Sequence, residues 1–323
     1  MRILVLIPSY NDLQLVVKRV KEIERRIGDV VGEYMVVDES DEESSLKYLP
    51  LLKKIDKVRI LHRERRLGKW FAWSVALDFM LNSDFDALIE LNADTFIEYP
   101  RRIVRSLEEG FDVVTCYSHY LAEGSPFASY VAKFYASIHS MWKRFHLFAM
   151  GGECLALSRR AVEKFKEHNL FSDPFPLDDY VISLAGLILG LKCTSIDCGL
   201  ILKLPQTLNE WMMYRLRHRE KTLEMAHLYL KRKLGSNYFR KADWLIDRYW
   251  QMYKFIVARH LISSFFGTAP LVILQYLLAK IPFQVESPIT WRRLQSEKRL
   301  SSNDLWSVRT ALLLFRKPKG ARL

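Results

Sequence analysis

The residues best suited to chemistry lie in segment 88–95, Leu-Ile-Glu-Leu-Asn-Ala-Asp-Thr, where an apolar run ends in a short acidic turn. A parallel strand buried on both faces is typically such a continuous apolar run. Ligands of open α/β sheets bind just outside the carboxyl ends of the strands, which is where Asp94 would stand. Oxygen ligands suit Mg²⁺ or Mn²⁺, so Asp94 and Asn92 form a candidate metal site. The alternative is an ordinary strand-end turn, in which Asp is common.

A second acidic pair, Asp178 and Asp179, precedes the apolar segment Tyr180–Leu191, which we expect to be helical. Two adjacent carboxylates at a helix N-terminus suit a general-base role. Helix capping with a first-turn acid is the alternative, and this arrangement is common.

Two further polar segments each follow an expected strand. Residues 8–11, Pro-Ser-Tyr-Asn, include Pro8 and Tyr10, and the backbone amides of this turn could meet a base or a phosphate. Asp38 and Glu39 could accept hydrogen bonds from a base N–H or a ribose hydroxyl. Taken alone, the first segment is better explained by helix capping, whereas a solvated acidic loop explains the second segment about as well as a binding role does.

The segment Arg66-Leu67-Gly68-Lys69 opens an expected helix. Gly68 permits a close backbone approach, and Lys69 can bring a positive charge to a diphosphate. The segment lacks the Gly-x-x-x-x-Gly-Lys-Ser/Thr pattern of a Walker loop.

Taken together and in this order, the segments resemble the family 2 glycosyltransferases, which are inverting enzymes of the GT-A fold. The resemblance covers roughly residues 1–220. Ile3–Asp12 looks like the family's opening strand and turn, Val36–Ser40 like its Val-Val-Asp-Asp-Gly-Ser segment, and Gly68-Lys69 with Ala72 like its Gly-Lys-x-x-Ala segment. Asn92–Thr95 looks like its Asp-x-Asp-Thr metal motif, Gly151-Gly152 like its acceptor-side glycine pair, and Asp178-Asp179 like its Glu-Asp pair. Tyr214–His218 occupies the place of its Gln-Arg-x-Arg-Trp segment.

This resemblance implies metal-assisted transfer of a sugar from a nucleoside diphosphate sugar to a hydroxyl acceptor, a glycan or a lipid-linked molecule. Asp179 would be the general base beside Asp178, Gly151 and Gly152 would face the acceptor, and Mg²⁺ or Mn²⁺ would be held by Asp94 with Asn92. The donor would be bound by Pro8, Tyr10, Asp38, Glu39, Lys69, Asn92, Asp94, Arg215 and Arg217.

Two departures from the family pattern narrow this expectation. Asn92 stands where Asp is usual, so the metal would be held mainly by Asp94 and the diphosphate. Tyr214 and His218 replace Gln and Trp, which argues against a processive polymerase of the cellulose-synthase type.

The positioning elements follow from the alternation of apolar runs and helical spacing. We expect strands near residues 2–7, 34–37, 57–61, 86–91, 111–116 and 193–202, and helices near 13–27, 44–54, 68–81, 100–109, 158–167 and 180–191. Residues 154–157 form a further apolar stretch. This alternation predicts an α/β fold with a doubly wound, mostly parallel sheet. Residues 1–220 would form the transferase domain.

The remaining residues, 221–323, are expected to form a helical, basic, partly membrane-associated region. Residues 203–323 carry 23 Lys or Arg against 8 Asp or Glu, a net charge of +15, whereas residues 1–202 carry 26 against 29. Segment 261–279 has no charged side chain and could be an interfacial or re-entrant element, a span or a core helix. We therefore expect the protein at the cytoplasmic face of a membrane.

Charge and cysteine usage leave other readings open. The basic C-terminal region with interleaved aromatics could bind nucleic acid, although an uncharged run has no obvious role there, so no nucleic-acid partner is expected. A non-catalytic relative that only binds nucleotide sugars is conceivable because of Asn92. A nucleotidyltransferase would usually have a Gly-rich loop after the first strand, which the chain lacks.

The four cysteines, Cys116, Cys154, Cys193 and Cys198, are expected to be buried, reduced thiols.

Overall fold

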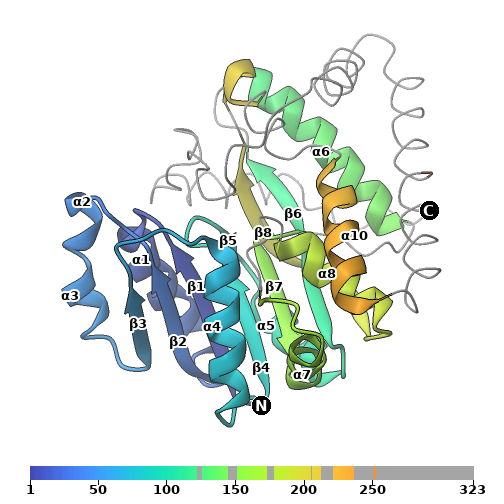
Figure 1. The fold of residues 1–323 in the computed structure, drawn as a ribbon. Coiled ribbons are helices and arrows are strands. Elements are labelled where there is room, and N and C mark those ends of the chain that lie inside the picture. The colour runs from blue at the N-terminus through green and yellow to red at the C-terminus, as the bar shows by residue number, and fades with distance from the viewer. Residues whose placement is uncertain are drawn as a thin grey trace, which may run out of the picture.

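The computed structural model describes residues 1–121, 126–144, 151–172, 178–204, 206–211, 221–235 and 251 (Figure 1). The strands are β1 (Ile3–Ser9), β2 (Val31–Asp38), β3 (Val58–His62), β4 (Ala87–Leu91), β5 (Phe96–Ile97), β6 (Val113–Leu121), β7 (Cys154–Ser158) and β8 (Cys193–Lys203). The helices are α1 (Leu13–Ile27), α2 (Glu43–Leu46), α3 (Leu49–Leu52), α4 (Lys69–Leu81), α5 (Arg101–Glu108), α6 (Pro126–Arg144), α7 (Arg159–Glu167), α8 (Asp178–Ile188) and α10 (Lys221–Leu234).

The strands form one sheet in the order β3-β2-β1-β4-β7-β6-β8-β5. The first four are parallel, as the sequence predicts. Strand β7 runs antiparallel to both β4 and β6, β6 and β8 are parallel, and β5 is antiparallel to β8. The α/β prediction is therefore confirmed, but the sheet is mixed rather than mostly parallel in its second half.

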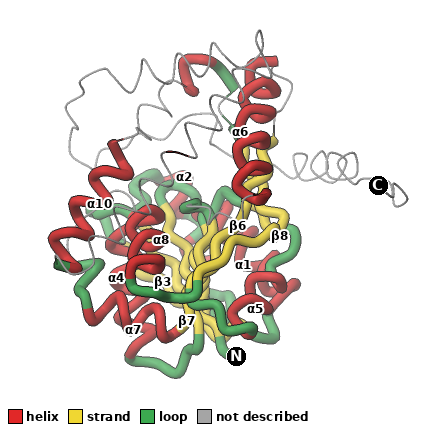
Figure 2. The backbone as a smooth tube through the Cα atoms, turned by 90° about the vertical axis from the view of Figure 1, so that its right-hand side faces the viewer, coloured by secondary structure: helices red, strands yellow, loops and turns green. Residues whose placement is uncertain are grey.

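Helices cover both faces of the sheet, which Figure 2 shows nearly edge-on. Helices α4, α7, α8 and α10 lie on one face, and α1, α3 and α5 cover the other. Strand β1 supplies both cores because successive side chains point to opposite faces: Leu4 and Leu6 join one core, whereas Ile3, Val5 and Ile7 join the other. This two-sided burial explains the unbroken apolar runs of the N-terminal strands.

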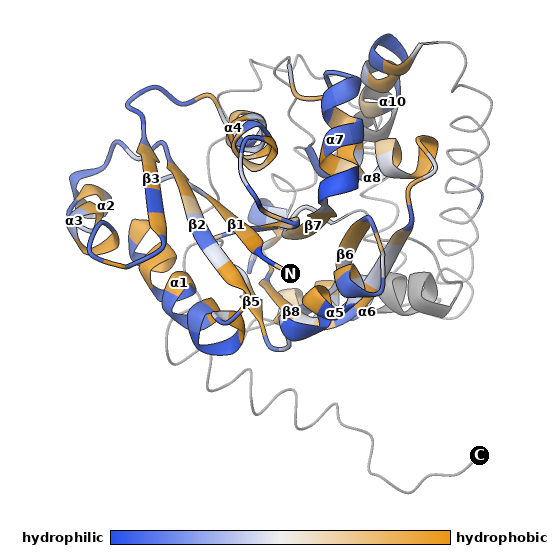
Figure 3. Ribbon diagram, turned by 90° about the horizontal axis from the view of Figure 1, so that it is seen from below, coloured by the Kyte–Doolittle hydropathy of each residue, from blue (hydrophilic) through white to orange (hydrophobic). Residues whose placement is uncertain are grey.

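Helix α1 begins and ends where the sequence predicts. Its apolar side chains are buried at helical spacing against the sheet, and Arg25 and Arg26 lie in its last turn, where positive charge complements the helix dipole. Figure 3 shows the resulting contrast between the apolar inner and polar outer sides of the helices around the sheet.

Other elements differ from expectation. The helix expected at 44–54 is split into α2 and α3. Pro50 lies in the first turn of α3, where its missing N–H costs no hydrogen bond within the helix. Strand β5 and helix α6 were not predicted from the sequence. Two residues are too few for a periodic signal, and β5 exists because it pairs with Leu200 and Ile201 of β8.

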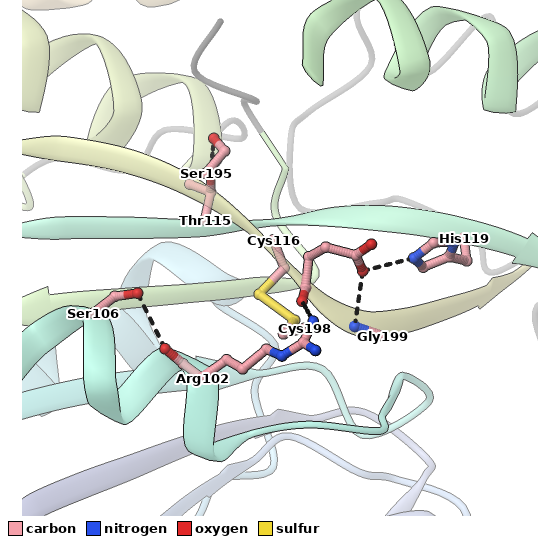
Figure 4. Close-up of a disulfide and its surroundings, with 9 residues drawn as sticks. Arg102, Ser106, Thr115, Cys116, His119, Ser195, Cys198 and Gly199 are labelled. Carbon is pink, nitrogen blue, oxygen red and sulfur yellow. Dashed lines mark hydrogen bonds and ion pairs between the residues drawn. A yellow bond between two sulfur atoms is a disulfide. The ribbon is translucent and has the colours of Figure 1, made fainter. Parts of the chain in front are cut away.

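Cys116 of β6 and Cys198 of β8 form a disulfide in the core (Figure 4), with their Cα atoms 6.1 Å apart. The prediction of reduced thiols is therefore wrong for these two residues, whereas Cys154 and Cys193 are free. The two paired cysteines are 82 residues apart, and the β6–β8 register is irregular just beyond Cys116. Their pairing depends on strand order, which spacing along the chain does not reveal.

Most of the basic C-terminal region, including segment 261–279, lies outside the described residues. Within the part of the chain that the structure describes, no helix has the length and apolarity needed to cross a membrane. Helix α10 is part of the expected C-terminal region, yet it packs on α8 through Ala226, Tyr229 and Leu230 in the sheet's core. The domain boundary expected near residue 220 stays a prediction.

Candidate active site

A cleft of about 260 Å³ opens at the carboxyl ends of β1, β2 and β4, where ligands bind in doubly wound folds. It is lined by Pro8, Ser9, Tyr10, Asp12, Val37, Glu39, Arg66, Gly68, Lys69, Ala72, Asn92, Ala93 and Asp94. Four of the five segments singled out in the sequence thus meet around one cavity, although up to 86 residues separate them along the chain.

One wall is built from the turn after β1. The guanidinium of Arg66 lies 4.0 Å from the centroid of the Tyr10 ring, a cation–π contact between two lining residues. The neighbouring Asn11 has a positive φ of 58°, and its side-chain oxygen accepts from the backbone amides of Asp41 and Glu42, both at 3.0 Å. These contacts fix the loop after β1 to the loop after β2.

Asp38 and Glu39 have different positions. Asp38 is fully buried, and its carboxylate accepts from Ser40 Oγ at 2.6 Å and lies 2.7 Å from Nδ1 of His62. Glu39 lines the cleft and accepts from the backbone amides of Leu67 and Gly68, at 2.7 and 2.9 Å. Of the two, only Glu39 reaches the cavity, and it also anchors the loop that carries Lys69.

Gly68 has a φ of +88°, a backbone conformation that side-chain-bearing residues rarely adopt. It turns the chain directly into α4, so that Lys69, the first residue of that helix, enters the site. The ammonium of Lys69 lies 3.0 Å from Oε1 of Glu90 and 3.3 Å from Oδ2 of Asp178, and it donates to the carbonyl of Gly152.

Charges in this group perturb one another strongly. Burial alone would lower the pKa of Lys69, but the carboxylates of Asp178 and Glu90 outweigh this effect, and the pKa is raised. Burial raises the pKa of Glu90, whereas the positive charge of the nearby Lys69 opposes the shift and favours the carboxylate. Burial also raises the pKa of Glu153, beside Gly151 and Gly152.

Asn92 and Asp94 lie at the end of β4, as predicted. The Asn92 carbonyl accepts from the amide and hydroxyl of Thr95, at 3.3 and 2.9 Å, which closes a tight turn. The backbone amide of Asn92 donates to the backbone carbonyl of Glu153 at 3.2 Å. Burial raises the pKa of Asp94, whereas the positive charges of Arg19 and Lys69 oppose this.

No group of three or more His, Cys, Asp or Glu side chains among the described residues is arranged to hold a metal ion. A divalent ion that arrives with a diphosphate needs less, because Mg²⁺ is often bound by one or two carboxylates together with substrate phosphates and water. Asp94 and Asn92 both line the cleft and offer oxygen ligands of the right kind, so the residues present fit such an ion.

Asp178 and Asp179 begin α8 and have different environments. Asp178 is buried and accepts from Nε1 of Trp73 at 2.8 Å, in addition to its ion pair with Lys69. Burial, reinforced by the charge of Asp178, raises the pKa of Asp179 to about 7. A pKa near the working pH suits a general base, because a useful fraction of the carboxyl is ionised and the carboxylate is more basic than an ordinary one.

Gly151 and Gly152 lie beside these acids. A Cβ atom on residue 152 would be 3.0 Å from both Cβ and Oδ2 of Asp179, closer than side chains normally approach. Glycine at 152 therefore leaves room for the Asp179 carboxyl. Arg215 and Arg217 fall in 212–220, outside the described residues.

Sequence reasoning missed Glu90 and Glu153 as members of this group. Glu90 did carry a signal, since it is the one charged residue of the buried strand Ala87–Leu91. Glu153 carried none, because its place in the site depends on β7 pairing with β4.

The fold, but not the sequence, is similar to that of a known protein. Neither a scan of protein-family models nor a search of curated proteins finds a match. Among solved structures, the chain is similar to the mannosyltransferase PcManGT from Pyrobaculum calidifontis, solved in complex with GDP-Man and Mn²⁺. The sequences are 16% identical, the match covers 86% of this chain and 80% of the other, and the TM-score is 0.52. The chain thus shares its fold with a glycosyltransferase.

Proposed function

We propose that the protein is an inverting glycosyltransferase that moves a sugar from a nucleoside diphosphate sugar to a hydroxyl acceptor. The observation that carries this proposal is the placement of one acid in the cleft and of a second acid next to Lys69, which lines the same cleft. Asp94 lines the cavity at the end of β4, whereas Asp179 lies beyond Lys69 at the start of α8, with a pKa of about 7. A fold shared with a mannosyltransferase supports the same reaction class.

The donor would occupy the cleft with its nucleoside toward Tyr10 and Glu39 and its diphosphate toward Asp94. Asp94 and Asn92 would hold Mg²⁺ or Mn²⁺, which would supply Lewis-acid neutralisation of the leaving diphosphate. Asp38, behind Glu39, would keep the β2 end in place through His62 rather than contact the nucleoside itself.

In the transfer step, the acceptor hydroxyl attacks the anomeric carbon from the side opposite the diphosphate. The new carbon–oxygen bond forms as the bond to the diphosphate oxygen breaks, which inverts the configuration. Asp179 takes the proton of the attacking hydroxyl, and the nucleoside diphosphate leaves with the bonding electrons. General-base assistance of this kind contributes about 10²–10⁴-fold to the rate.

The acceptor is proposed to be a lipid-linked molecule or a surface glycan at the cytoplasmic face of a membrane. The support is the net charge of +15 in residues 203–323, since basic segments bind anionic headgroups. Flotation with liposomes tests this: the full chain should float with anionic but not neutral vesicles. A truncation ending at residue 235 that floats equally well would argue against it.

The donor site is tested by thermal stabilisation of the protein with GDP, UDP and the other nucleoside diphosphates, each with and without Mn²⁺. We expect one diphosphate to raise the melting temperature in a metal-dependent way, and the Asp94→Asn variant to lose this response. If none of the nucleoside diphosphates raises the melting temperature, the proposal is contradicted.

A further inference from the structure

Lys69 is the centre of a group of contacts, at the edge of the cleft, that the motif resemblance does not assign. An ammonium has three protons to donate, and three acceptors surround this one: the Glu90 carboxylate at 3.0 Å, the Asp178 carboxylate at 3.3 Å and the Gly152 carbonyl. Each acceptor comes from a different element or loop, namely β4, α8 and the loop before β7. The protein itself therefore supplies two carboxylates and one carbonyl around the Lys69 ammonium, from three different parts of the chain.

Glu90 has no exposed surface, and Lys69 is its ion-pair partner within the described residues. A carboxylate in a buried strand is unfavourable unless a positive charge compensates it. Glu90 thus anchors the Lys69 ammonium to β4, at the edge of the cleft that Lys69 lines.

The other two partners of Lys69, Asp178 and Gly152, are both neighbours of Asp179. Asp178 precedes Asp179 in α8, and its Oδ2 atom also accepts from Nε1 of Trp73 at 2.8 Å. Lys69 and Trp73 are one turn apart on α4, so the same face of that helix supplies two donors to one oxygen. Gly152 packs directly against the Asp179 side chain from the other side.

We propose that the Lys69–Glu90 ion pair positions Asp179, through Asp178 and Gly152, and does not bind the donor diphosphate. Both are positioning residues for the transfer step, so the inference rests on the proposed function. It replaces the phosphate-binding role that the sequence predicts for Lys69.

The test compares Lys69→Met, Glu90→Gln and the double variant Lys69→Met/Glu90→Met with the wild-type protein. Lys166→Met is the matched control, because Lys166 also pairs with an acid of α4, Asp78, but on the surface away from the cleft. Two quantities are measured: the Kd for GDP or UDP with Mn²⁺, and kcat for cleavage of the matching sugar donor.

We expect Lys69→Met to lower kcat by about 10²-fold, the cost of displacing a reacting group by roughly 1 Å, and to leave the Kd within about threefold. Glu90→Gln should lower kcat without changing the Kd. The double variant should be more stable than Lys69→Met, because the buried Glu90 charge is removed together with its partner, but it should not recover kcat. A tenfold weaker Kd in Lys69→Met with a smaller loss of kcat would overturn the inference, as would kcat recovery in the double variant.

A crystal structure of the double variant separates this inference from the proposed function. The Asp179 carboxyl should move away from Gly152 once Lys69 no longer holds its neighbours. An Asp179 side chain in the same place would overturn the positioning role, whether or not the protein proves to be a transferase. A wild-type protein that binds no nucleoside diphosphate would instead refute the proposed function.

Discussion

Gly152 and Asp179 lie in van der Waals contact, so that a Cβ added at residue 152 would be 3.0 Å from Oδ2 of Asp179. The glycine comes from the loop before β7 and the acid from the first turn of α8. The position of the Asp179 side chain, which we propose as the base, therefore depends on a glycine 27 residues earlier in the chain.

Gly152→Ala should push the Asp179 side chain out of place and lower kcat for donor cleavage by about 10²-fold, as expected for a misplacement of roughly 1 Å. The affinity for nucleoside diphosphate should not change, because Gly152 does not line the cleft. Gly151→Ala is the matched comparison: its Cβ would first meet the flexible end of Glu153, at 3.2 Å, and a smaller loss is expected. Equal losses in the two variants would contradict this account.

The pH dependence of activity should reflect Asp179. Since the base must be ionised and its pKa is raised to about 7, kcat should rise with pH and level off above this value. A pH–rate profile measured from pH 5 to 9 checks this. A rate that is constant from pH 5 upward would mean that no group with a raised pKa acts as the base.

Stability should change with pH in the opposite sense. The folded-state pKa of Asp179 lies above the unfolded value near 4, so its burial as a neutral acid contributes stability at low pH that is lost as pH rises through about 7. Asp179→Asn removes this loss. The variant should therefore gain melting temperature relative to wild type at pH 8 and show little difference at pH 4, and an equal difference at both pH values would contradict the raised pKa.

Metal binding should depend on the two residues at the end of β4 in opposite ways. Asp94→Asn removes the one carboxylate of the proposed pair and should abolish Mn²⁺-dependent stabilisation by a nucleoside diphosphate. Asn92→Asp adds a carboxylate and should strengthen it. A diphosphate at 100 times its Kd stabilises a protein by about 2.7 kcal/mol, so calorimetry can detect both changes. Metal dependence that persists in Asp94→Asn would place the ion elsewhere.

The disulfide can be tested by counting thiols. Alkylation of the denatured, unreduced protein should modify only Cys154 and Cys193, and reduction should raise the number from two to four. A disulfide typically stabilises a protein by about 2–4 kcal/mol, so Cys116→Ala should lower the melting temperature. Modification of all four cysteines before reduction would contradict the Cys116–Cys198 pairing.

Local sequence patterns predicted most of the N-terminal half of the fold. Buried parallel strands read as apolar runs, and α1 has clear helical periodicity, so the cleft residues after β1, β2 and β4 could be found from strand ends alone. The second half could not be predicted in the same way. The direction of β7, the two-residue strand β5 and the Cys116–Cys198 pair all depend on contacts between distant segments.

The same limit applies to the site. Asp94 and Asp179 were recognisable because each stands at the end of a strand or the start of a helix. The contacts of Lys69 with Glu90, Asp178 and Gly152 could not be predicted, because these residues meet only after β4, α8 and the loop before β7 have packed together. The sequence therefore predicted which side chains lie near the cleft, but not which of them form ion pairs or hydrogen bonds with one another.

The most direct test of the central claim is donor cleavage by Asp179→Asn. The variant should lose about 10²–10⁴-fold in kcat and bind the nucleoside diphosphate with Mn²⁺ as tightly as wild type. Asp84→Asn, an exposed acid remote from the cleft, is the control and should leave both quantities unchanged. Undiminished turnover in Asp179→Asn would contradict the account, since the proposed base would then play no part in the reaction.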